Sequence, residues 1–521
     1  MPLPWFLRSE QSPLDDATAA GIPRGAEFFR TDDLRSDLGR KTARGGAYTV
    51  ASTGVNFVVS TGGMIVLARL LTPDDFGLIG MVTAILAFAT LFKDIGLSRA
   101  VVQRPEITHG QVSTLFWINV ALSTGVATLL AAATPLIVTF YDEPRLTWIN
   151  VAMAGMFLIS GLSLQHRALL ERRMHFGVLT LTQVVSVAIG TAAAIAAATA
   201  GLGYWSLVIL PAVTQVVTML ILWGACTWRP GPPRRGTGVR PMLAFGGHVT
   251  GFQVLNTAVR NVDNILIGWY WGAAPLGLYT RAYALMMLPA QRFNGPMTSV
   301  AVPALARMVD QPSTYRNSYT KALNGLAMCT APAAIAMGVV APELIPLVLG
   351  EQWTDAVAIF IALVPAAVMA ATNVAAGWVY LSYGHVHRQW KWSLIEMWPL
   401  VIAMVIGLQW GALGVAIGVS VTRVVLKLPG LAWAYRGTPL RLTDFLSANT
   451  FPLLLSALTG LAGLLAYFAC AQSGIDDAFP VLAIKLGVMA AAFFGCVTLF
   501  PQGRASISRL RQLIIARRLS T

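Results

Sequence analysis

Long apolar stretches recur along the whole chain of 521 residues, and they restrict the folds open to it. A run of about 18 or more apolar residues is long enough to cross the hydrocarbon core of a membrane as a helix. Charged residues make up only 12% of the chain, whereas a typical soluble domain has about 25%. The short alternating segments typical of a membrane-spanning β-barrel are absent. We therefore predict an all-α integral membrane protein.

About 14 stretches are predicted to be membrane-spanning helices. The apolar patterning places them near residues 46–71, 76–95, 114–140, 147–165, 177–200, 204–226, 243–270, 276–303, 322–349, 355–383, 392–409, 411–434, 449–471 and 478–500.

The connecting segments alternate in charge. If the N-terminus is cytoplasmic, the cytoplasmic segments contain 29 lysine and arginine residues, and the opposite loops contain one clear basic residue, Arg145. Eight acids lie in those opposite loops, among them Asp74, Asp75 and Glu351. Basic residues concentrate in cytoplasmic loops of membrane proteins. The pattern predicts that both termini are cytoplasmic, and it explains the net charge of +14 better than nucleic-acid binding does.

The chain also repeats itself with an offset of 200 residues. Gly46 aligns with Gly246, Asn56 with Asn256, and Gly77-Leu78 with Gly277-Leu278. The first predicted span thereby falls on the seventh and the second on the eighth. Six spans per repeat give both copies the same orientation, as in a transporter with parallel repeats. We predict two six-helix lobes in a parallel pseudo-repeat, followed by two C-terminal helices.

This organisation divides the chain into six segments. They are a cytoplasmic N-terminal tail (1–45), an N-lobe (46–227), a cytoplasmic inter-lobe loop (228–242), a C-lobe (243–435), spans 13 and 14 (436–500) and a basic cytoplasmic tail (501–521).

Three stretches resemble one family of membrane proteins. LARLLTPDDFGLIGMVTAI (67–85) is followed by LFKDIGLSRAVVQR (91–104), and VDNILIGWYWGAAPLGLYTRAYALMMLP (262–289) is the second-half counterpart. The Arg-x-Leu-x-Pro-x-x-Phe-Gly turn and the Asp-x-Gly-x-x-x-Ala after span 2 resemble the polysaccharide transporter family. That family belongs to the multidrug/oligosaccharidyl-lipid/polysaccharide exporter superfamily. The resemblance covers roughly residues 40–440.

The resemblance implies a function at the bacterial inner membrane. Members of the family move undecaprenyl-pyrophosphate-linked oligosaccharides across that membrane for exopolysaccharide, O-antigen or capsule assembly, by alternating access. The implied partners are this lipid-linked substrate, the bilayer, and the polysaccharide polymerase and chain-length machinery. A cation-coupled multidrug exporter of the same superfamily is the alternative. A membrane enzyme of the same pathway is a third class, which the short outer loops disfavour.

Charged and amide side chains within the predicted spans are candidates for the transport cavity, because intramembrane charge is costly and usually functional. Arg260 and Asp263 lie three residues apart in span 7 and share one helix face, on which they could also neutralise each other. Arginine suits a pyrophosphate because its guanidinium binds phosphate oxygens bidentately. The candidate substrate-binding residues are Arg260, Asp263, Asn56, Asn256, Arg281, Arg292, Arg423 and Glu396.

Other polar residues have simpler expected roles. Arg69 is expected to snorkel to the interface or, as the alternative, to line the outer mouth of the cavity. Lys485 is expected to snorkel, Lys427 to face the cytoplasm, and Glu396 to pair with Lys391 or His387. The aromatic residues of spans 7 and 8 are expected to form an interfacial belt or, as the alternative, to stack on sugar faces of the substrate. These residues are Trp269, Tyr270, Trp271, Tyr279 and Tyr283.

The sequence contains no recognisable catalytic or cofactor motif. The histidines form no HExxH arrangement, and no GxxxxGK[ST] phosphate loop is present. The four cysteines lie singly in apolar segments, so neither a disulfide framework nor a zinc site is predicted. We expect a transporter without catalytic residues, cofactor, bound metal or nucleic-acid partner.

Overall fold

The computed structural model describes residues 38–92, 107–233 and 261–500, together with residues 98, 101, 102, 104, 257, 503 and 504. The ordered elements of these residues are all helical. Contacts divide the chain into two compact units. Unit 1 comprises residues 1–67, 85–139 and 143–255, and unit 2 comprises residues 68–84, 140–142 and 256–521.

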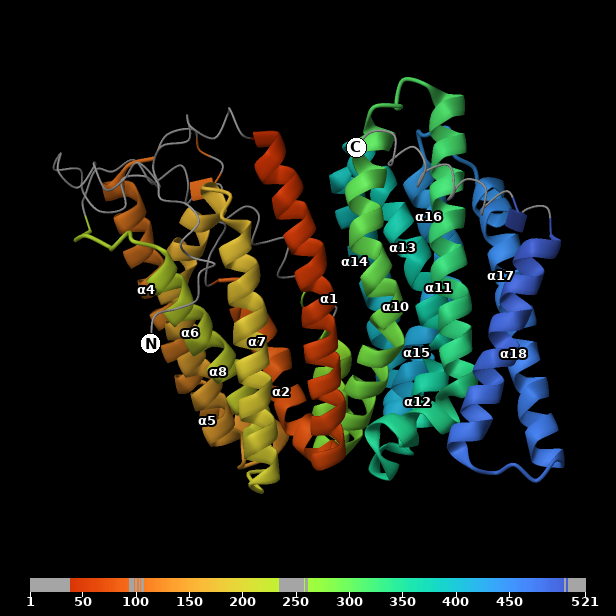
Figure 1. Cartoon of the computed structure of the whole chain (residues 1–521), viewed down its shortest axis with the longest axis horizontal. Coiled ribbons are helices and arrows are strands. Elements are labelled where there is room, and N and C mark those ends of the chain that lie inside the picture. The colour runs from red at the N-terminus through yellow and green to blue at the C-terminus, as the bar shows by residue number, and fades with distance from the viewer. Residues whose placement is uncertain are drawn as a thin grey trace. The chain divides into compact units, whose positions relative to one another are not determined.

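Unit 1 is an antiparallel bundle in which α4 packs on α6, α6 on α8, and α7 on α8 (Figure 1). The third predicted span is broken at Ala133 into α4 and α5, just before Pro135. Proline has no N–H to continue the helical hydrogen bonds, which favours a break here. The helices lying wholly or largely in this unit are α1 (Leu38–Leu70), α4 (His109–Ala132), α5 (Thr134–Tyr141), α6 (Leu146–Arg172), α7 (Phe176–Thr199) and α8 (Trp205–Ala225).

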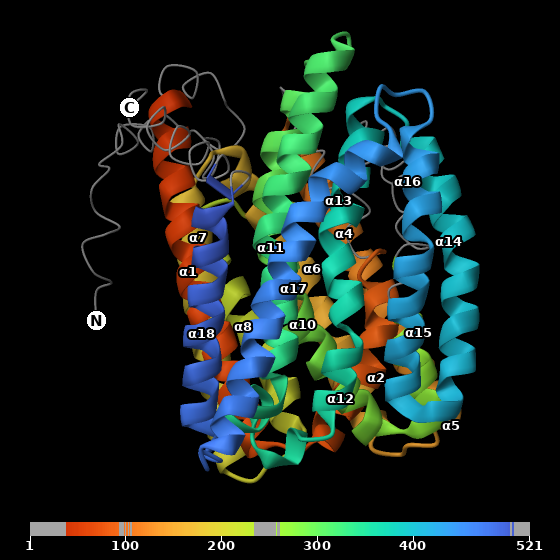
Figure 2. The same cartoon turned by 90° about the vertical axis from the view of Figure 1, so that its right-hand side faces the viewer.

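Unit 2 contains the longest helices and several broken ones (Figure 2). The chain reverses at Gly411, where φ is 71°, so that α14 and α15 lie side by side. Its elements are α2 (Pro73–Ala89), which it shares with unit 1, α10 (Ala273–Ala306), α11 (Pro312–Leu349), η5 (Glu351–Trp353), α12 (Ala356–Ala362), α13 (Val364–Ser382), α14 (Val386–Gly407), η6 (Leu408–Trp410), α15 (Gly411–Val425), α16 (Lys427–Tyr435), α17 (Leu442–Gln472) and α18 (Ala478–Leu499).

The start of α2 crosses the start of α10 at two glycines that the 200-residue repeat pairs. A Cβ on Gly77 would lie 1.7 Å from the carbonyl oxygen of Ala273, and a Cβ on Gly277 would lie 1.8 Å from that of Pro73. Any side chain at either glycine would therefore clash with backbone. The two contacts are reciprocal, because Pro73 and Ala273 are also 200 residues apart. Reciprocal contacts are what a two-fold relation between repeats produces.

The described helices are roughly consistent with the 14 predicted spans. Ten described helices are long and apolar enough to cross a membrane. One of these segments, Val386–Tyr435, contains the reversal at Gly411 and so provides two spans. Two further helices, the 17-residue α2 and the proline-rich α10, lie at the second and eighth predicted spans but are not among these ten. Most of the seventh predicted span lies outside the described residues. The all-α membrane architecture is thus confirmed, and the predicted segment boundaries stay a prediction.

The last two helices, α17 and α18, pack together against α11 (Figure 2). At one end Arg316 of α11 forms a bidentate ion pair with Asp444 of α17, with a shortest distance of 2.6 Å. Near the other end, Val340 of α11 packs against Leu482 and Met489 of α18. The two helices outside the repeat are therefore an integral part of unit 2.

Candidate functional site

A buried carboxylate lies in the helical segment 261–271 of unit 2. Asp263 is 7% exposed, and its Oδ2 accepts a hydrogen bond of 2.8 Å from the hydroxyl of Tyr279 in α10. Its Oδ1 accepts a second bond, of 2.9 Å, from the backbone N–H of Asn264. No basic side chain of the described residues forms an ion pair with it. Among the described residues, Asp263 thus has two hydrogen-bond donors and no cation at ion-pair distance.

The next turn of α10 connects this carboxylate to Arg423. Tyr283 stacks on Tyr279, with ring centroids 6.0 Å apart, and its hydroxyl accepts a hydrogen bond of 3.2 Å from Nη2 of Arg423. The Arg423 guanidinium also lies 6.0 Å from the centre of the Tyr283 ring. Tyr279 and Tyr283 therefore belong to an interior polar network, and the prediction that Tyr279 joins an interfacial belt is wrong, since it is fully buried.

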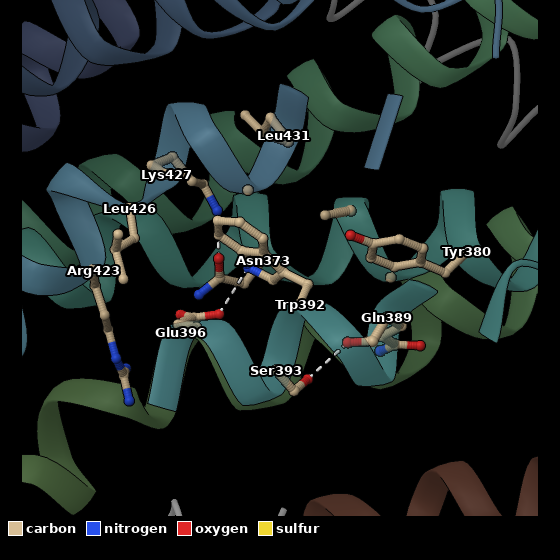
Figure 3. Close-up of a pocket in the computed structure, with 13 residues that line it drawn as sticks. Asn373, Tyr380, Gln389, Trp392, Ser393, Glu396, Arg423, Leu426, Lys427 and Leu431 are labelled. Atoms are coloured by element: carbon tan, nitrogen blue, oxygen red, sulfur yellow. Dashed lines mark hydrogen bonds between the residues drawn. The ribbon is translucent and has the colours of Figure 1, made fainter. Parts of the chain in front are cut away.

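Arg423 lies at one end of a polar cavity of about 250 Å³ within unit 2 (Figure 3). The walls are formed by α13, α14 and the α15–α16 junction at Leu426, where the helix breaks. Charged, hydroxyl, amide and aromatic side chains all line this space. The lining residues are Asn373, Ala376, Gly377, Tyr380, Gln389, Trp392, Ser393, Glu396, Arg423, Leu426, Lys427, Gly430 and Leu431.

Lys427 is the second cation of the cavity. It is only 6% exposed, so the prediction that it faces the cytoplasm is wrong. Its ammonium donates a hydrogen bond to the side-chain oxygen of Asn373 (Figure 3), a neutral partner. A lysine ammonium has three donors, and within the described part of the chain this is the one bond that it forms. Lys427 thus has spare donors at the cavity.

Glu396 is the acid of the cavity. Its Oε2 accepts a hydrogen bond of 3.1 Å from the indole N–H of Trp392, one turn earlier in α14. The expected pairing with Lys391 or His387 is absent among the described contacts, where Glu396 bonds to Trp392 alone. Two cations and one carboxylate therefore line the same space, and neither cation forms an ion pair with a described acid.

A buried hydroxyl, that of Tyr380, also lines the cavity. Tyr380 of α13 is 4% exposed, and its hydroxyl has no hydrogen-bond partner among the described residues. Figure 3 shows this hydroxyl turned towards the Trp392 side of the cavity. Buried polar groups are normally hydrogen-bonded, and an exception needs an explanation such as a missing ligand. The unmet donor is the kind of group that a bound ligand would satisfy.

The structure brings three of the predicted site residues, Asp263, Arg423 and Glu396, into this region of unit 2. Arg281 lies elsewhere on α10, with its guanidinium 4.8 Å from the centre of the Phe76 ring. Arg292 is exposed farther along α10, and Asn56 lies on α1 in unit 1. Arg260 and Asn256 fall outside the described residues. The assignment of all eight to substrate binding stays a prediction.

A second charged site in unit 2 is fully neutralised. The ammonium of Lys485 in α18 lies 2.7 Å and 2.9 Å from the two carboxylate oxygens of Glu343 in α11. It also donates to the carbonyl oxygen of Val339 at 2.7 Å and lies 5.1 Å from the centre of the Tyr467 ring. Lys485 is 2% exposed, so the prediction that it snorkels is wrong. This pair satisfies itself and offers nothing to a ligand.

The turn between α1 and α2 has a structural role. Asp75 accepts hydrogen bonds from the backbone N–H and hydroxyl of Thr72, at 2.9 Å and 2.8 Å, which tie the residue before α2 to the first turn of that helix. Arg69 donates to the carbonyl oxygens of Leu347 and Val348, in the last turn of α11. Arginine stabilises a helix C-terminus in this way. Neither predicted role of Arg69 included this bond.

Sequence reasoning missed the neutral members of the cavity. Asn373, Tyr380 and Trp392 have ordinary neighbours in apolar helices, and nothing in their spacing distinguishes them. One available signal was the four-residue spacing of Arg423 and Lys427, which places two cations on one face. No group of three or more histidine, cysteine or acidic side chains in the described residues is placed to hold a metal ion.

The chain is similar to proteins that are named for lipopolysaccharide and teichuronic acid biosynthesis. The chain is 26% identical over 398 residues to the lipopolysaccharide biosynthesis protein WzxC of Escherichia coli (strain K12), covering 74% of this chain and 80% of that protein. It is 27% identical over 441 residues to the teichuronic acid biosynthesis protein TuaB of Bacillus subtilis (strain 168), covering 82% and 89%.

Solved structures share its fold at lower identity. The inward closed conformation of the lipid II flippase MurJ superposes with a TM-score of 0.70 at 12% identity, covering 88% of this chain and 99% of that one. An inward-facing multidrug resistance transporter of the MATE family, in the MOP superfamily, superposes with a TM-score of 0.59 at 15% identity, covering 73% and 94%. The sequence model of one family matches residues 66–358, more than half of the chain. The chain therefore belongs to the family described as polysaccharide biosynthesis protein.

Proposed function

We propose that this protein moves undecaprenyl-pyrophosphate-linked oligosaccharide units across the bacterial inner membrane for exopolysaccharide, O-antigen or capsule assembly. The movement is alternating access, in which the two repeats rock about a site within the membrane. The protein acts with the bilayer and hands its product to polysaccharide polymerase and chain-length machinery.

The observation that supports this function most strongly is the cationic cavity. Arg423 and Lys427 lie inside a segment apolar enough to span a membrane, and neither has an acid within ion-pair distance among the described residues. An arginine or lysine at the middle of a spanning helix costs about 2.5–3.5 kcal/mol on insertion scales. An anionic ligand that enters the cavity would offset this cost. The saccharide of a lipid-linked unit, where it bears an acidic group, would supply such an anion together with hydroxyl groups for the amides and for Tyr380.

The relatives agree with a saccharide substrate. Their names refer to lipopolysaccharide, teichuronic acid and succinoglycan, and one of them is called a transport protein. The fold is shared with a solved structure that is named a lipid II flippase. These likenesses support transport of a lipid-linked unit over catalysis.

The loop charges support a cytoplasmic position for both termini. In unit 2, Arg307, Arg436 and Arg441 lie in connections at one end of the helices, and Glu351, Asp476 and Asp477 lie in connections at the other end. Basic residues mark the cytoplasmic side. Both termini are therefore proposed to lie on the cytoplasmic side.

A deletion strain tests the proposal directly. Without the protein, polymer export should stop and lipid-linked units should accumulate on the cytoplasmic leaflet. An enzyme or oxidant added outside spheroplasts should not reach them there. The full chain should restore export, whereas Arg423→Gln should restore it at least about tenfold less, because a hydrogen bond to a charged group contributes about 1.5–3 kcal/mol. Arg307→Gln, which changes an exposed arginine at the end of α10, is the matched control and should restore export fully.

Two results would overturn the proposal. Normal polymer and no accumulation in the deletion strain would exclude the lipid-linked substrate. Increased drug sensitivity of that strain with intact polymer would favour the multidrug exporter, whose fold this chain shares.

A further inference from the structure

The cavity described above is too small for a whole lipid-linked oligosaccharide. Its volume of about 250 Å³ is below the roughly 300–1,000 Å³ of pockets that enclose drug-sized ligands. It has room for one group of the size of a monosaccharide. The rest of an oligosaccharide would have to lie outside it.

The charge of the cavity matches a ligand with one negative charge. Its lining includes two cations, Arg423 and Lys427, and one acid, Glu396, which leaves a net charge of +1. A carboxylate balances this charge, whereas a diphosphate brings more than one negative charge close to Glu396. Of the two cations, Arg423 is held by its bond to Tyr283 and lies over that ring, whereas Lys427 bonds to Asn373 and keeps two of its three ammonium donors unused among the described residues.

The neutral lining is suited to a sugar ring. Trp392 and Tyr380 supply aromatic surface with a polar edge, and Asn373 and Gln389 supply amides that both donate and accept. The ring of Trp392 lies against Gly430, where a Cβ would approach it to 3.0 Å, so the glycine makes room for the indole. The Tyr380 hydroxyl has no partner among the described residues and is available to a sugar hydroxyl or carboxylate.

We infer that this cavity is a subsite for one acidic sugar of the cargo, a hexuronic acid or another sugar that bears a carboxylate. The carboxylate binds the ammonium of Lys427 beside Asn373, and the ring lies along Trp392 and Tyr380. This inference rests on the proposed function, because it assigns part of the lipid-linked saccharide to these residues. It makes the protein selective for glycan units that contain an acid.

Binding of free sugars to the purified full-length protein in detergent tests the subsite. Saturation-transfer difference NMR with D-glucuronate measures binding, and D-glucose, D-glucose 1-phosphate and inorganic phosphate are titrated as competitors. Glucuronate should bind at least about tenfold more tightly than each of the three, because only it unites a ring with a single negative charge. Equal affinity for glucose, or stronger competition by either phosphate compound, would overturn the assignment.

Variants locate the binding. Lys427→Gln should weaken glucuronate binding at least about tenfold, and Trp392→Leu should weaken it severalfold. Lys321→Gln, which changes an exposed lysine of α11, should leave it unchanged. Unchanged binding in Lys427→Gln would also overturn the subsite. The competition experiment uses the wild-type protein, so it tests the subsite even if a variant does not fold.

Failure here is distinguishable from failure of the proposed function. A protein that restores polymer export but does not bind glucuronate keeps its function and loses the subsite. A deletion strain without lipid-linked accumulation removes the function, whatever the sugar binding shows.

Discussion

Two sites in unit 2 place charge inside the membrane, and they treat it in opposite ways. Glu343 and Lys485 neutralise each other at 2.7 Å and are both less than a tenth exposed. Arg423 and Lys427 bond only to neutral partners among the described residues, and they line a cavity together with Glu396. A neutralised pair holds helices together, whereas unneutralised charge at a cavity can bind a ligand. The difference separates a structural site from a transport site within one bundle.

The largest expected effect is the loss of one partner from the neutralised pair. Lys485→Met should destabilise the protein by about 3–5 kcal/mol, because Glu343 would remain buried without its counter-charge. The melting temperature of the purified protein measures this. The double variant Glu343→Gln and Lys485→Met should recover most of the loss, since removing both charges is often neutral. If Lys485→Met were as stable as the parent, the contrast between the neutralised pair and the unneutralised cations would be wrong.

Asp263 lies between the two extremes, since it has two hydrogen-bond donors and no ion pair among the described residues. Tyr279→Phe removes one donor and should cost about 1–3 kcal/mol, the cost of leaving a buried acceptor unsatisfied. Thermal unfolding measures the loss. Tyr283→Phe is a useful control, because its hydroxyl accepts from Arg423 and does not bond to Asp263. Equal melting temperatures for the parent and Tyr279→Phe would show that this bond adds no stability.

Filling the cavity should affect transport without changing charge. Gly377 lines the cavity and has no atom within 4 Å of the place where a Cβ would lie. Gly377→Leu should therefore fold normally and reduce export about tenfold, which corresponds to about 1.4 kcal/mol. Gly377→Ala, with one carbon, should reduce it less. Full export by the leucine variant, with wild-type protein levels, would show that the space in the cavity is not used.

The smallest effect is expected at a more exposed ion pair, which also joins a glutamate to a basic side chain. Glu143 and Arg145 form an ion pair of 2.8 Å between α5 and α6, and the hydrogen bond from Arg145 lowers the pKa of Glu143 below its ordinary value. The pair should contribute less than about 1 kcal/mol. This contribution is complete above the ordinary glutamate pKa of about 4.3 and is lost as the pH falls through the lowered pKa.

Comparison of Glu143→Gln with the parent between pH 7 and pH 3 measures this contribution. The two melting temperatures should differ slightly at pH 7 and converge at the acid end. A difference as large as that of Lys485→Met would contradict the contrast between an exposed and a buried pair.

The helices were predictable because each depends on local composition. Apolar length and loop charge predict the spans. The 200-residue offset pairs Gly77 with Gly277, the two glycines at which α2 crosses α10. Charge pairing across the bundle was not predictable, because it depends on which helices pack together. Lys485 meets Glu343 from 142 residues away, and Arg423 meets Tyr283 from 140 residues away. Only the fold shows which charge is neutralised.

The central claim is that unneutralised charge in this bundle serves transport and neutralised charge serves stability. The most direct measurement compares two charge-removing double variants in the deletion strain and as purified proteins. Arg423→Gln with Lys427→Gln should melt like the parent and leave lipid-linked units on the cytoplasmic leaflet, whereas Glu343→Gln with Lys485→Met should export polymer. Export by the first variant, or lost export by a stable and normally expressed second variant, would contradict the account.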